Sequence, residues 1–371
     1  MTLQHTALYA EHEKLGASFT DFGGWQMPLK YSSELGEHHA VRNAAGLFDL
    51  SHMGEVWVTG PEAAELLDYA LVGKLSAIKV GKAKYSLICN EDGGILDDLI
   101  TYRLAEDRFL VVPNASNAPT VAAAFQQRAA NFDAVVDDQS LSTSLIALQG
   151  PKAEAILLRL VAGDQADAVR ELRYYAAIEL RVAGIDVLLA RTGYTGEDGF
   201  ELMISNSDAV ALWTQLLETG ADDGLKPAGL ACRDSLRLEA GMPLYGHELN
   251  VDITPAEAGM GKIVSYAKDG DFVGRAALEP AKDVEPEHVL VGLRGTGRRA
   301  ARAGYGVHVD GADVAVGEVT SGAPSPTLGY PIALAYVERS KAAEGTELTV
   351  DLRGKREPFI VVKPPFYRRE K

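Results

Sequence analysis

Cysteine is scarce in this 371-residue chain, which has only Cys89 and Cys232 and no Cys-x-x-Cys pair. We therefore expect neither a disulfide framework nor a thiolate metal site, and the composition fits a reducing compartment. No apolar run is long enough to span a bilayer, and the N-terminus shows neither a signal-peptide pattern nor an Arg-rich amphipathic segment. Together these absences predict a cytoplasmic protein without a membrane partner.

Positive charge is also in short supply. Lysine and arginine number 36 against 52 acidic residues, and the formal net charge is −16. A general nucleic-acid or anionic-membrane binder needs a positive field, so both classes are disfavoured. The length allows two or three domains, and 47% hydrophobic with 24% charged residues is typical of a soluble globular protein.

Patterns of metal ligands and nucleophiles are missing as well. His38 and His39 are adjacent, so they cannot both face one site on a helix, and no His-x-x-x-His pair occurs. The glycine-rich segment 191–201 lacks the Gly-Lys-Ser/Thr of a phosphate loop, and Cys232 has no recognisable nucleophile context. We expect no metal. Residues 1–54 show little periodicity, which predicts loops and short helices.

Two adjacent carboxylates, Asp97 and Asp98, follow a Gly93-Gly94 turn and open an apolar run that reads as a strand. Side chains alternate faces along a strand, so the two carboxylates must point opposite ways. One can face water while the other enters the interior, where an acid costs free energy unless something uses it. The plain alternative is a pair of ordinary turn aspartates.

An internal repeat spans about 55–130 and 145–220. Each copy starts with a strand, passes through Gly60-Pro61 or Gly150-Pro151 into a helix, and later runs through a Phe-containing strand and Ser-Asn into another helix. The spacing predicts two β-α-β-β-α-like units and an α+β fold with a cleft between the copies. We expect residues 1–280 to form two interleaved α+β domains.

The C-terminal part shows a different sequence pattern. Residues 225–245 read as a helix with a charged face, which Gly241 and Pro243 stop. After about residue 285, short strands separated by turns predict a small β-barrel or sandwich as a separate domain over 285–371. The linker is expected from Glu279-Pro280 to Glu287.

Five long motifs occur along the chain in one particular order. They are Phe-Asp-Leu-Ser-His-Met (48–53), Gly-Ile-Leu-Asp-Asp-Leu (94–99), Gly-Tyr-Thr-Gly-Glu-Asp-Gly-Phe-Glu (193–201), Arg-Asp-Ser-Leu-Arg-Leu-Glu-Ala-Gly-Met-Pro-Leu-Tyr-Gly (233–246) and Thr-Ser-Gly-Ala-Pro-Ser-Pro-Thr-Leu-Gly-Tyr (320–330). Together they resemble the T-protein family of the glycine cleavage system, over nearly the whole chain.

The resemblance implies a three-domain cloverleaf with a C-terminal barrel and folate in a central channel. It also implies a tetrahydrofolate-dependent aminomethyltransferase, in which an aminomethyl group arrives on the dihydrolipoyl arm of an H-protein. Ammonia is released, and the one-carbon unit leaves as 5,10-methylene-tetrahydrofolate. Tetrahydrofolate as co-substrate and the lipoyl group on the H-protein are the expected cofactors, and a monomer that binds H-protein transiently is the expected assembly.

The same resemblance assigns roles to individual residues. Asp97 matches the catalytic acid, and a carboxylate near the folate nitrogens can accept a proton there. Glu201 matches a pterin-binding carboxylate, which can accept two hydrogen bonds from the ring; without the family, a cross-strand ion pair would be the default. Arg233 matches a folate contact, and Arg237, four residues on, could share that face or support it.

Five further residues could surround the folate. Tyr85, Tyr102, Tyr194 and Met53 could wall the ring or its benzoyl part, and Asn114 could hydrogen-bond near it; core packing is an equal alternative for all five. The only dense basic run, at Arg294, Arg298, Arg299 and Arg302, is either a solvated loop or a docking patch for an acidic partner such as H-protein.

Two other functions fit the same scaffold. One is a folate-dependent demethylase of a small methylated compound, which would need no carrier protein. The other is a non-enzymatic folate-binding or iron–sulfur assembly factor, whose Lys-Gly-Cys-Tyr-type motif this sequence lacks. Asp97 within its motif and the long 233–246 block favour the aminomethyltransferase over the demethylase.

Overall fold

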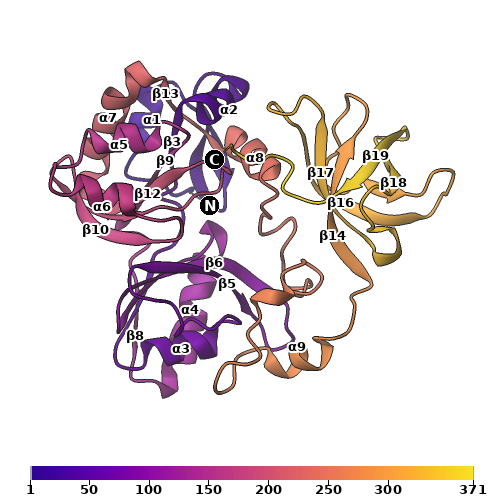
Figure 1. The fold of residues 1–371 in the computed structure, drawn as a ribbon, viewed down its shortest axis with the longest axis horizontal. Coiled ribbons are helices and arrows are strands. Elements are labelled where there is room, and N and C mark those ends of the chain that lie inside the picture. The colour runs from indigo at the N-terminus through magenta and orange to yellow at the C-terminus, as the bar shows by residue number, and fades with distance from the viewer. Residues whose placement is uncertain (1, 371) are drawn as a thin grey trace. The chain divides into compact units, whose positions relative to one another are not determined.

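The computed structural model describes residues 2–370, which form a two-stranded sheet, a five-stranded sheet, a six-stranded sheet and a closed barrel (Figure 1). The contacts divide the chain into two compact units. The first unit holds most residues up to Arg233, and the second holds residues from Asp234 onward together with Leu71–Gly73 and Leu87–Asp98.

The N-terminal segment contains more strand than its sequence predicts. Its elements are α1 (Tyr9–Lys14), β1 (Ser18–Phe22), β2 (Trp25–Lys30), α2 (Glu34–Asn43) and β3 (Ala45–Asp49). Strand β3 is buried along its whole length inside the six-stranded sheet. A strand buried on both faces shows no polar–apolar alternation, and for this reason the prediction of loops and short helices over 1–54 is wrong here.

The first repeat builds the five-stranded sheet, in the order β5-β6-β7-β4-β8. Its elements are β4 (Val56–Thr59), α3 (Ala63–Ala70), β5 (Lys82–Cys89), β6 (Ile95–Ala105), β7 (Arg108–Val112), η1 (Ala115–Asn117), α4 (Ala118–Arg128), η2 (Ala129–Asn131) and β8 (Val135–Asp138).

The second repeat builds most of the six-stranded sheet, in the order β10-β11-β12-β9-β3-β13. Its elements are β9 (Thr143–Gln149), α5 (Ala153–Leu158), α6 (Ala166–Glu171), β10 (Ala177–Val182), β11 (Ile185–Ala190), β12 (Gly199–Ser205), η3 (Asn206–Asp208), α7 (Ala209–Gly220), η4 (Ala221–Asp223) and β13 (Leu225–Pro227).

The two repeats share one topology, since β5-β6-β7-β4 corresponds strand for strand to β10-β11-β12-β9. The duplication and the α+β class that the sequence predicts are confirmed. Gly60 and Gly150 occupy equivalent turns with φ of 123° and 134°, and a Cβ at either would lie within 2.7 Å of a backbone carbonyl. Only glycine tolerates this combination, which accounts for the repeated Gly-Pro motif. The copies differ in that β3 enters the second sheet between β9 and β13.

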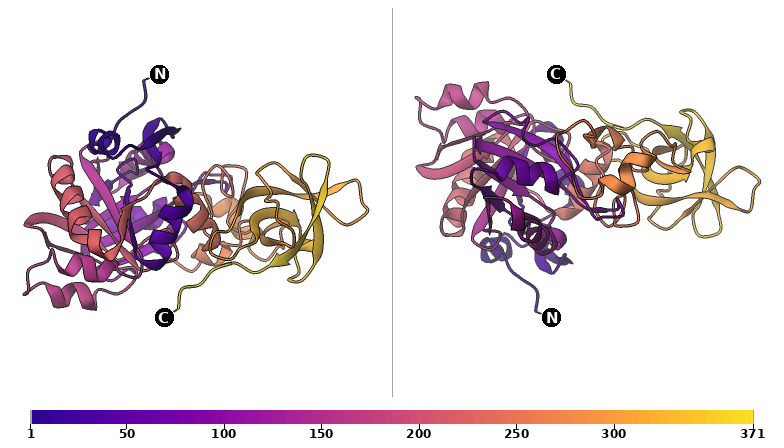
Figure 2. Two further views of the ribbon diagram at one scale, coloured as in Figure 1. Left: turned by 90° about the horizontal axis from the view of Figure 1, so that it is seen from above. Right: turned by 90° about the horizontal axis from the view of Figure 1, so that it is seen from below.

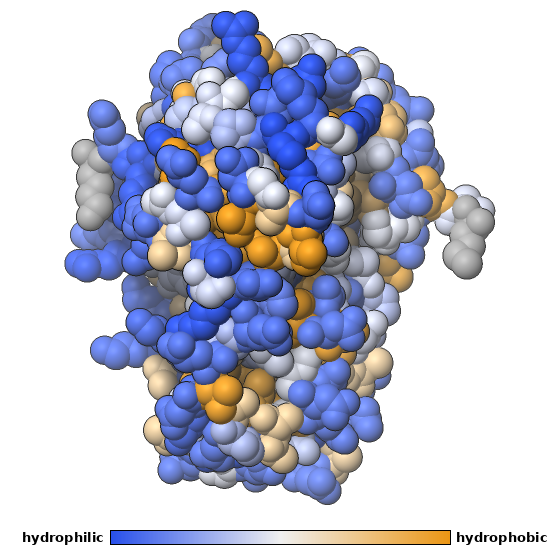
Figure 3. Space-filling model, turned by 90° about the vertical axis from the view of Figure 1, so that its right-hand side faces the viewer, coloured by the Kyte–Doolittle hydropathy of each residue, from blue (hydrophilic) through white to orange (hydrophobic). Residues whose placement is uncertain are grey.

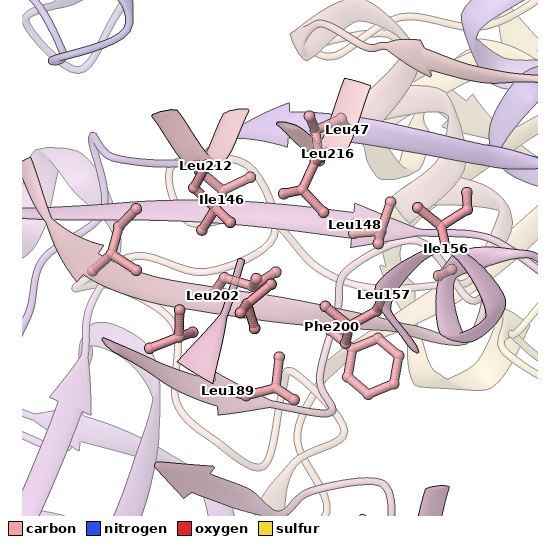
Figure 4. Close-up of a cluster of buried hydrophobic side chains, with 14 of the residues drawn as sticks. Leu47, Ile146, Leu148, Ile156, Leu157, Leu189, Phe200, Leu202, Leu212 and Leu216 are labelled. Carbon is pink, nitrogen blue, oxygen red and sulfur yellow. The ribbon is translucent and has the colours of Figure 1, made fainter. Parts of the chain in front are cut away.

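Helices cover one face of the six-stranded sheet and build a core there (Figure 4). The side chains that meet in it are Leu47, Ile146, Leu148, Leu189, Phe200 and Leu202 from the strands and Ile156, Leu157, Leu212 and Leu216 from α5 and α7. Because alternate residues of a strand point to opposite faces, the residues between these ones lie on the other face of the sheet.

Helix α8 (Leu230–Glu239) is shorter than the predicted helix over 225–245, because residues 225–227 form β13. Its last residue is Glu239, and the predicted stop at Gly241, whose φ is 67°, follows two residues later. The chain then passes through η5 (Gly261–Ile263) and α9 (Arg275–Ala281), which includes the first residues of the expected linker.

The C-terminal strands close into a six-stranded barrel in the order β14-β17-β16-β15-β18-β19, drawn in orange to yellow (Figure 2). They are β14 (His288–Gly295), β15 (Gly306–His308), β16 (Ala315–Pro324), β17 (Pro331–Glu338), β18 (Glu347–Asp351) and β19 (Arg356–Val362), with η6 (Arg339–Lys341) after β17. The small barrel is confirmed. Ala333 and Ala335 on β17 lie among larger buried side chains, as the narrow interior of such a barrel requires.

Hydrophilic side chains predominate on the face in Figure 3, where hydrophobic ones form small groups. No helix among residues 2–370 is both long and apolar enough to cross a membrane.

Candidate functional site

Strand β12 carries Glu201 on the sheet face opposite the helices, because its neighbours Phe200 and Leu202 point into the core. The residues directly beside Glu201 on the adjacent strands are Ala147 and Ala190. Both alanine side chains are short and buried, so neither neighbour places a bulky group beside the carboxylate.

The Glu201 carboxylate is held by two hydroxyl groups. Thr192 Oγ1 donates a hydrogen bond to Glu201 Oε2, and the Tyr102 hydroxyl lies 3.4 Å from the same oxygen and 3.0 Å from Thr192 Oγ1. Both contacts use Oε2. Burial raises the pKa of Glu201 above its ordinary value, although the Thr192 hydrogen bond and the nearby charge of Arg233 act in the opposite direction.

Arg233, in the first turn of α8, lies with its guanidinium carbon 4.7 Å from the centroid of the Tyr194 ring. A guanidinium at this distance is attracted to the face of the ring. Burial lowers the pKa of Arg233, and the neighbouring Tyr194 and Glu201 partly offset that effect. The structure therefore brings Glu201, Arg233, Tyr194 and Tyr102 together, and their contact with folate stays a prediction.

Gln149 fixes the loop that carries Tyr194. Its side-chain amide donates to the Thr192 carbonyl oxygen at 3.0 Å, and its Oε1 accepts from Thr195 Oγ1 at 2.8 Å. Gly193 passes so close that a Cβ there would lie 2.0 Å from Gln149 Oε1. Sequence reasoning missed Gln149, since nothing in the chain marks a glutamine at the end of an apolar strand as a loop anchor.

The far end of the same loop is tied down by a buried ion pair. Arg42 of α2 donates to Glu197 Oε1 at 2.9 Å and to the Thr195 carbonyl oxygen at 2.7 Å. Both side chains are almost fully buried. The glycine-rich motif is therefore a rigid loop, anchored at both ends by residues that lie far from it in the sequence.

His52, in the segment that carries Met53, lies close enough to Arg233 to sense its charge. Burial, with the charge of Arg233, lowers the pKa of His52 to about 4, and the imidazole Nδ1 has no partner in residues 2–370. Met53 itself is partly buried. The backbone N–H of Gly54 donates to the Pro113 carbonyl oxygen at 3.1 Å, so the Met53 and Asn114 segments lie side by side.

A buried network precedes this segment. Asp49 accepts hydrogen bonds from Thr6 Oγ1 at 2.6 Å and from His12 Nε2 at 2.8 Å, and the Tyr31 hydroxyl contacts His12 Nδ1 at 2.9 Å. Burial raises the pKa of Asp49, but the hydrogen bonds from His12, Ser51 and Thr6 outweigh it and hold the pKa below its ordinary value. Tyr85 lies on β5 and is partly exposed.

Asp97 belongs to the second unit and is fully buried, whereas its neighbour Asp98 is partly exposed. The two aspartates differ in burial as the alternation along β6 predicts. The turn before them is fixed, because a Cβ at Gly94 would lie 1.8 Å from the Val251 carbonyl oxygen. Tyr245 donates to the Ile95 carbonyl oxygen at 3.2 Å, and burial, with Asp97 and Asp98, raises its pKa.

The motifs 233–246 and 320–330 meet inside the second unit. Arg237 pairs with the buried Glu248 at 3.0 Å and donates to Ser321 Oγ at 2.7 Å, while Glu239 accepts from Ser325 Oγ at 2.5 Å and Thr327 Oγ1 at 2.7 Å. Arg237 therefore supports the structure. Among residues 2–370, no group of three or more potential ligands is arranged to hold a metal ion.

The chain matches the family model of the GCVT N-terminal domain over residues 8–268 and that of the glycine cleavage T-protein C-terminal barrel domain over residues 288–368. Aminomethyltransferases of Corynebacterium jeikeium and Streptomyces avermitilis are each 58% identical to it, over 100% and 99% of this chain and 99% and 98% of theirs. The crystal structure of the glycine cleavage system aminomethyltransferase T from Bartonella henselae is 40% identical, with a TM-score of 0.91 and full coverage of both chains. These matches show that the chain belongs to the glycine cleavage T-protein family of aminomethyltransferases.

Proposed function

We propose that the chain transfers an aminomethyl carbon from the dihydrolipoyl arm of an H-protein to tetrahydrofolate, with release of ammonia and formation of 5,10-methylene-tetrahydrofolate. The observation that carries the folate part is the partly buried Glu201, whose Oε1 makes neither of the contacts with Thr192 and Tyr102. A carboxylate in a partly apolar site is suited to the 2-amino group and N3–H of a pterin.

The residues around Glu201 would bind and orient the folate. Thr192 and Tyr102 fix the carboxylate, and the Tyr194 ring with the Arg233 guanidinium offers a flat, positively charged wall for the pterin carbonyl or a glutamyl carboxylate. Met53 and Asn114 would line the same site from their paired segments, and Tyr85 is a further candidate contact on β5.

Asp97 is the proposed catalytic acid. Tetrahydrofolate supplies two amines, N5 and N10, to which the one-carbon unit becomes attached, and their protons must leave. A fully buried carboxylate beside those amines can accept a proton and stabilise positive charge. Tyr245 fixes the strand start at Ile95, so we propose that it positions Asp97.

The basic run is the proposed H-protein contact. Arg294, Arg298, Arg299 and Arg302 are exposed, and Arg302 is anchored by donation to the Gly322 carbonyl oxygen at 3.0 Å. In a chain of net charge −16, these arginines are suited to an acidic partner. Reversing Arg298 and Arg299 to glutamate should weaken H-protein binding and flatten its salt dependence, and unchanged affinity would contradict the assignment.

A reconstituted assay tests the function. Purified protein, tetrahydrofolate and aminomethylated H-protein should yield ammonia and 5,10-methylene-tetrahydrofolate in equal amounts, with omission of either substrate as the control. Ammonia that forms equally fast without tetrahydrofolate would contradict the proposal. Turnover of a small methylated amine in place of loaded H-protein would favour the demethylase instead.

A further inference from the structure

Glu37, in the first turn of α2, carries a carboxylate that is almost completely buried, with 1% of the residue exposed. Three backbone N–H groups donate to it: those of Tyr31 and Ser32 to Oε1 at 2.8 and 3.0 Å, and that of Gly229 to Oε2 at 3.0 Å. Such donors compensate the loss of hydration that burial imposes on a carboxylate. Because Gly229 lies 192 residues further along the chain, the side chain joins two distant segments of the first unit.

Gly229 is the residue directly before α8, so Glu37 holds the start of that helix. The Gly229 N–H donates to Glu37, and the Gly229 carbonyl oxygen accepts from the Arg233 N–H at 3.1 Å. The first N–H groups of a helix have no partner within it, and a carboxylate is favoured at that positive end of the helix dipole. A Cβ at Gly229 would lie 2.3 Å from the Leu29 carbonyl oxygen, so only glycine fits here. One residue therefore connects the buried carboxylate to the backbone of Arg233.

The same helix holds the loop that carries Tyr194. Near the other end of α2, Arg42 pairs with Glu197 of that loop at 2.9 Å. Glu37 therefore fixes one side of the contact between Arg233 and Tyr194, and α2 as a whole fixes both sides. Because the attraction between a guanidinium and an aromatic ring depends on the distance between them, this helix sets the geometry of the wall that the two side chains form.

We propose that Glu37 is a positioning residue for tetrahydrofolate binding, which holds the start of α8 so that the Arg233 guanidinium lies against the Tyr194 ring. This inference rests on the proposed folate contact of Arg233. The role requires both carboxylate oxygens, because the three N–H donors are shared between Oε1 and Oε2. Glutamine has only one acceptor oxygen, and the orientation that keeps two of the three hydrogen bonds turns its NH2 group toward Gly229. Glu37→Gln should therefore release the start of α8.

Tetrahydrofolate binding to Glu37→Gln tests the proposal. We expect the dissociation constant, measured by equilibrium fluorescence titration, to rise at least ~fivefold. In the reconstituted assay, the KM for tetrahydrofolate should rise in parallel, while kcat at saturating tetrahydrofolate stays within about twofold because Asp97 is not altered. Glu34→Gln, which removes an exposed carboxylate from the same helical turn, is the matched control and should change neither quantity.

A double-mutant cycle separates positioning from a general loss of stability. In the Arg233→Lys background, Glu37→Gln should weaken tetrahydrofolate binding by less than about twofold further, because the guanidinium that Glu37 positions is already absent. An equal effect in both backgrounds would overturn the proposal, as would unchanged affinity in Glu37→Gln alone. If the unaltered protein does not bind tetrahydrofolate, the proposed function fails, and that result is distinct from either of these.

If Glu37→Gln does not fold, amide hydrogen exchange of the unaltered protein decides the question. Coupling between two sites is reciprocal, so tetrahydrofolate should slow exchange at Gly229 and Arg233 more than at the buried residues of α7. Equal slowing in the two regions would contradict the positioning role.

Discussion

The guanidinium carbon of Arg233 lies 4.7 Å from the centroid of the Tyr194 ring, so the first turn of α8 is joined to the glycine-rich loop beside Glu201. This contact unites two motifs that are about 40 residues apart in the chain. On its own, the first motif is a loop that leads into β12, and the second is the start of α8. Only their juxtaposition makes a wall that a flat, polar ring can use.

Arg233→Lys tests that wall. A lysine keeps the charge but loses the planar donor fork and most of the stacking, so tetrahydrofolate should bind about 10-fold more weakly. Equilibrium fluorescence titration measures the change in affinity. Arg237→Lys is not a suitable control variant, because Arg237 is part of a buried ion pair. Lys226→Arg, an exposed position before α8, is the matched control. Unchanged affinity in Arg233→Lys would remove Arg233 from the site.

Glu201→Gln tests the pterin carboxylate. The amide cannot accept two hydrogen bonds from the ring in the same geometry, so the dissociation constant for tetrahydrofolate should rise by roughly 10- to 100-fold. The fold should survive, because burial already raises the pKa of this acid and the neutral amide is cheaper to bury. A full-affinity variant would show that Glu201 does not contact the ring.

Gln149→Leu tests the anchoring of the Tyr194 loop. The substitution leaves the Thr192 carbonyl oxygen and the Thr195 hydroxyl without their partner, and we expect a loss of roughly 2 kcal/mol in the free energy of unfolding. Urea denaturation measures it, with Gln127→Leu on the exposed side of α4 as the control, which should shift stability by less than about 0.5 kcal/mol. Equal stabilities for the two variants would contradict the anchoring role.

His52 predicts a pH dependence of stability. Its pKa in the folded chain is about 4 against an ordinary value of 6.5, so between these values the unfolded chain binds a proton that the folded chain does not. Stability should therefore fall as the pH drops from 6.5 to 4, with a contribution of about 3 kcal/mol from this residue. Denaturation over that range should show that the free energy of unfolding of His52→Gln depends less on pH than that of the unaltered protein. His39→Gln, at an exposed position, should show no such decrease.

The sequence predicted those parts of the fold that repeat or alternate. The duplicated units, the C-terminal barrel and the end of α8 shortly before Gly241 follow from local signals, and the structure has them. Strand β3 was missed because complete burial removes alternation, and β15 because three residues, Gly306–His308, are too short to show a pattern.

Candidate site residues could be predicted only where a motif carries them. Glu201, Arg233, Tyr194 and Tyr102 came from the resemblance, and the structure brings them together. Gln149, Thr192 and the Arg42–Glu197 pair were missed, since their partners lie up to 155 residues away and no local pattern records such contacts.

The central claim is that one buried acid, Asp97, serves the chemical step. Asp97→Asn keeps the size of the side chain but cannot take a proton, so ammonia release from aminomethylated H-protein should fall by at least ~100-fold. Its tetrahydrofolate affinity should stay within about threefold of the unaltered protein, because Glu201 and Arg233 are the residues proposed to supply the binding. Asp98→Asn, on the neighbouring and partly exposed position, is the matched control and should keep most of the turnover. Ammonia release by Asp97→Asn at the rate of the Asp98→Asn variant would contradict the account.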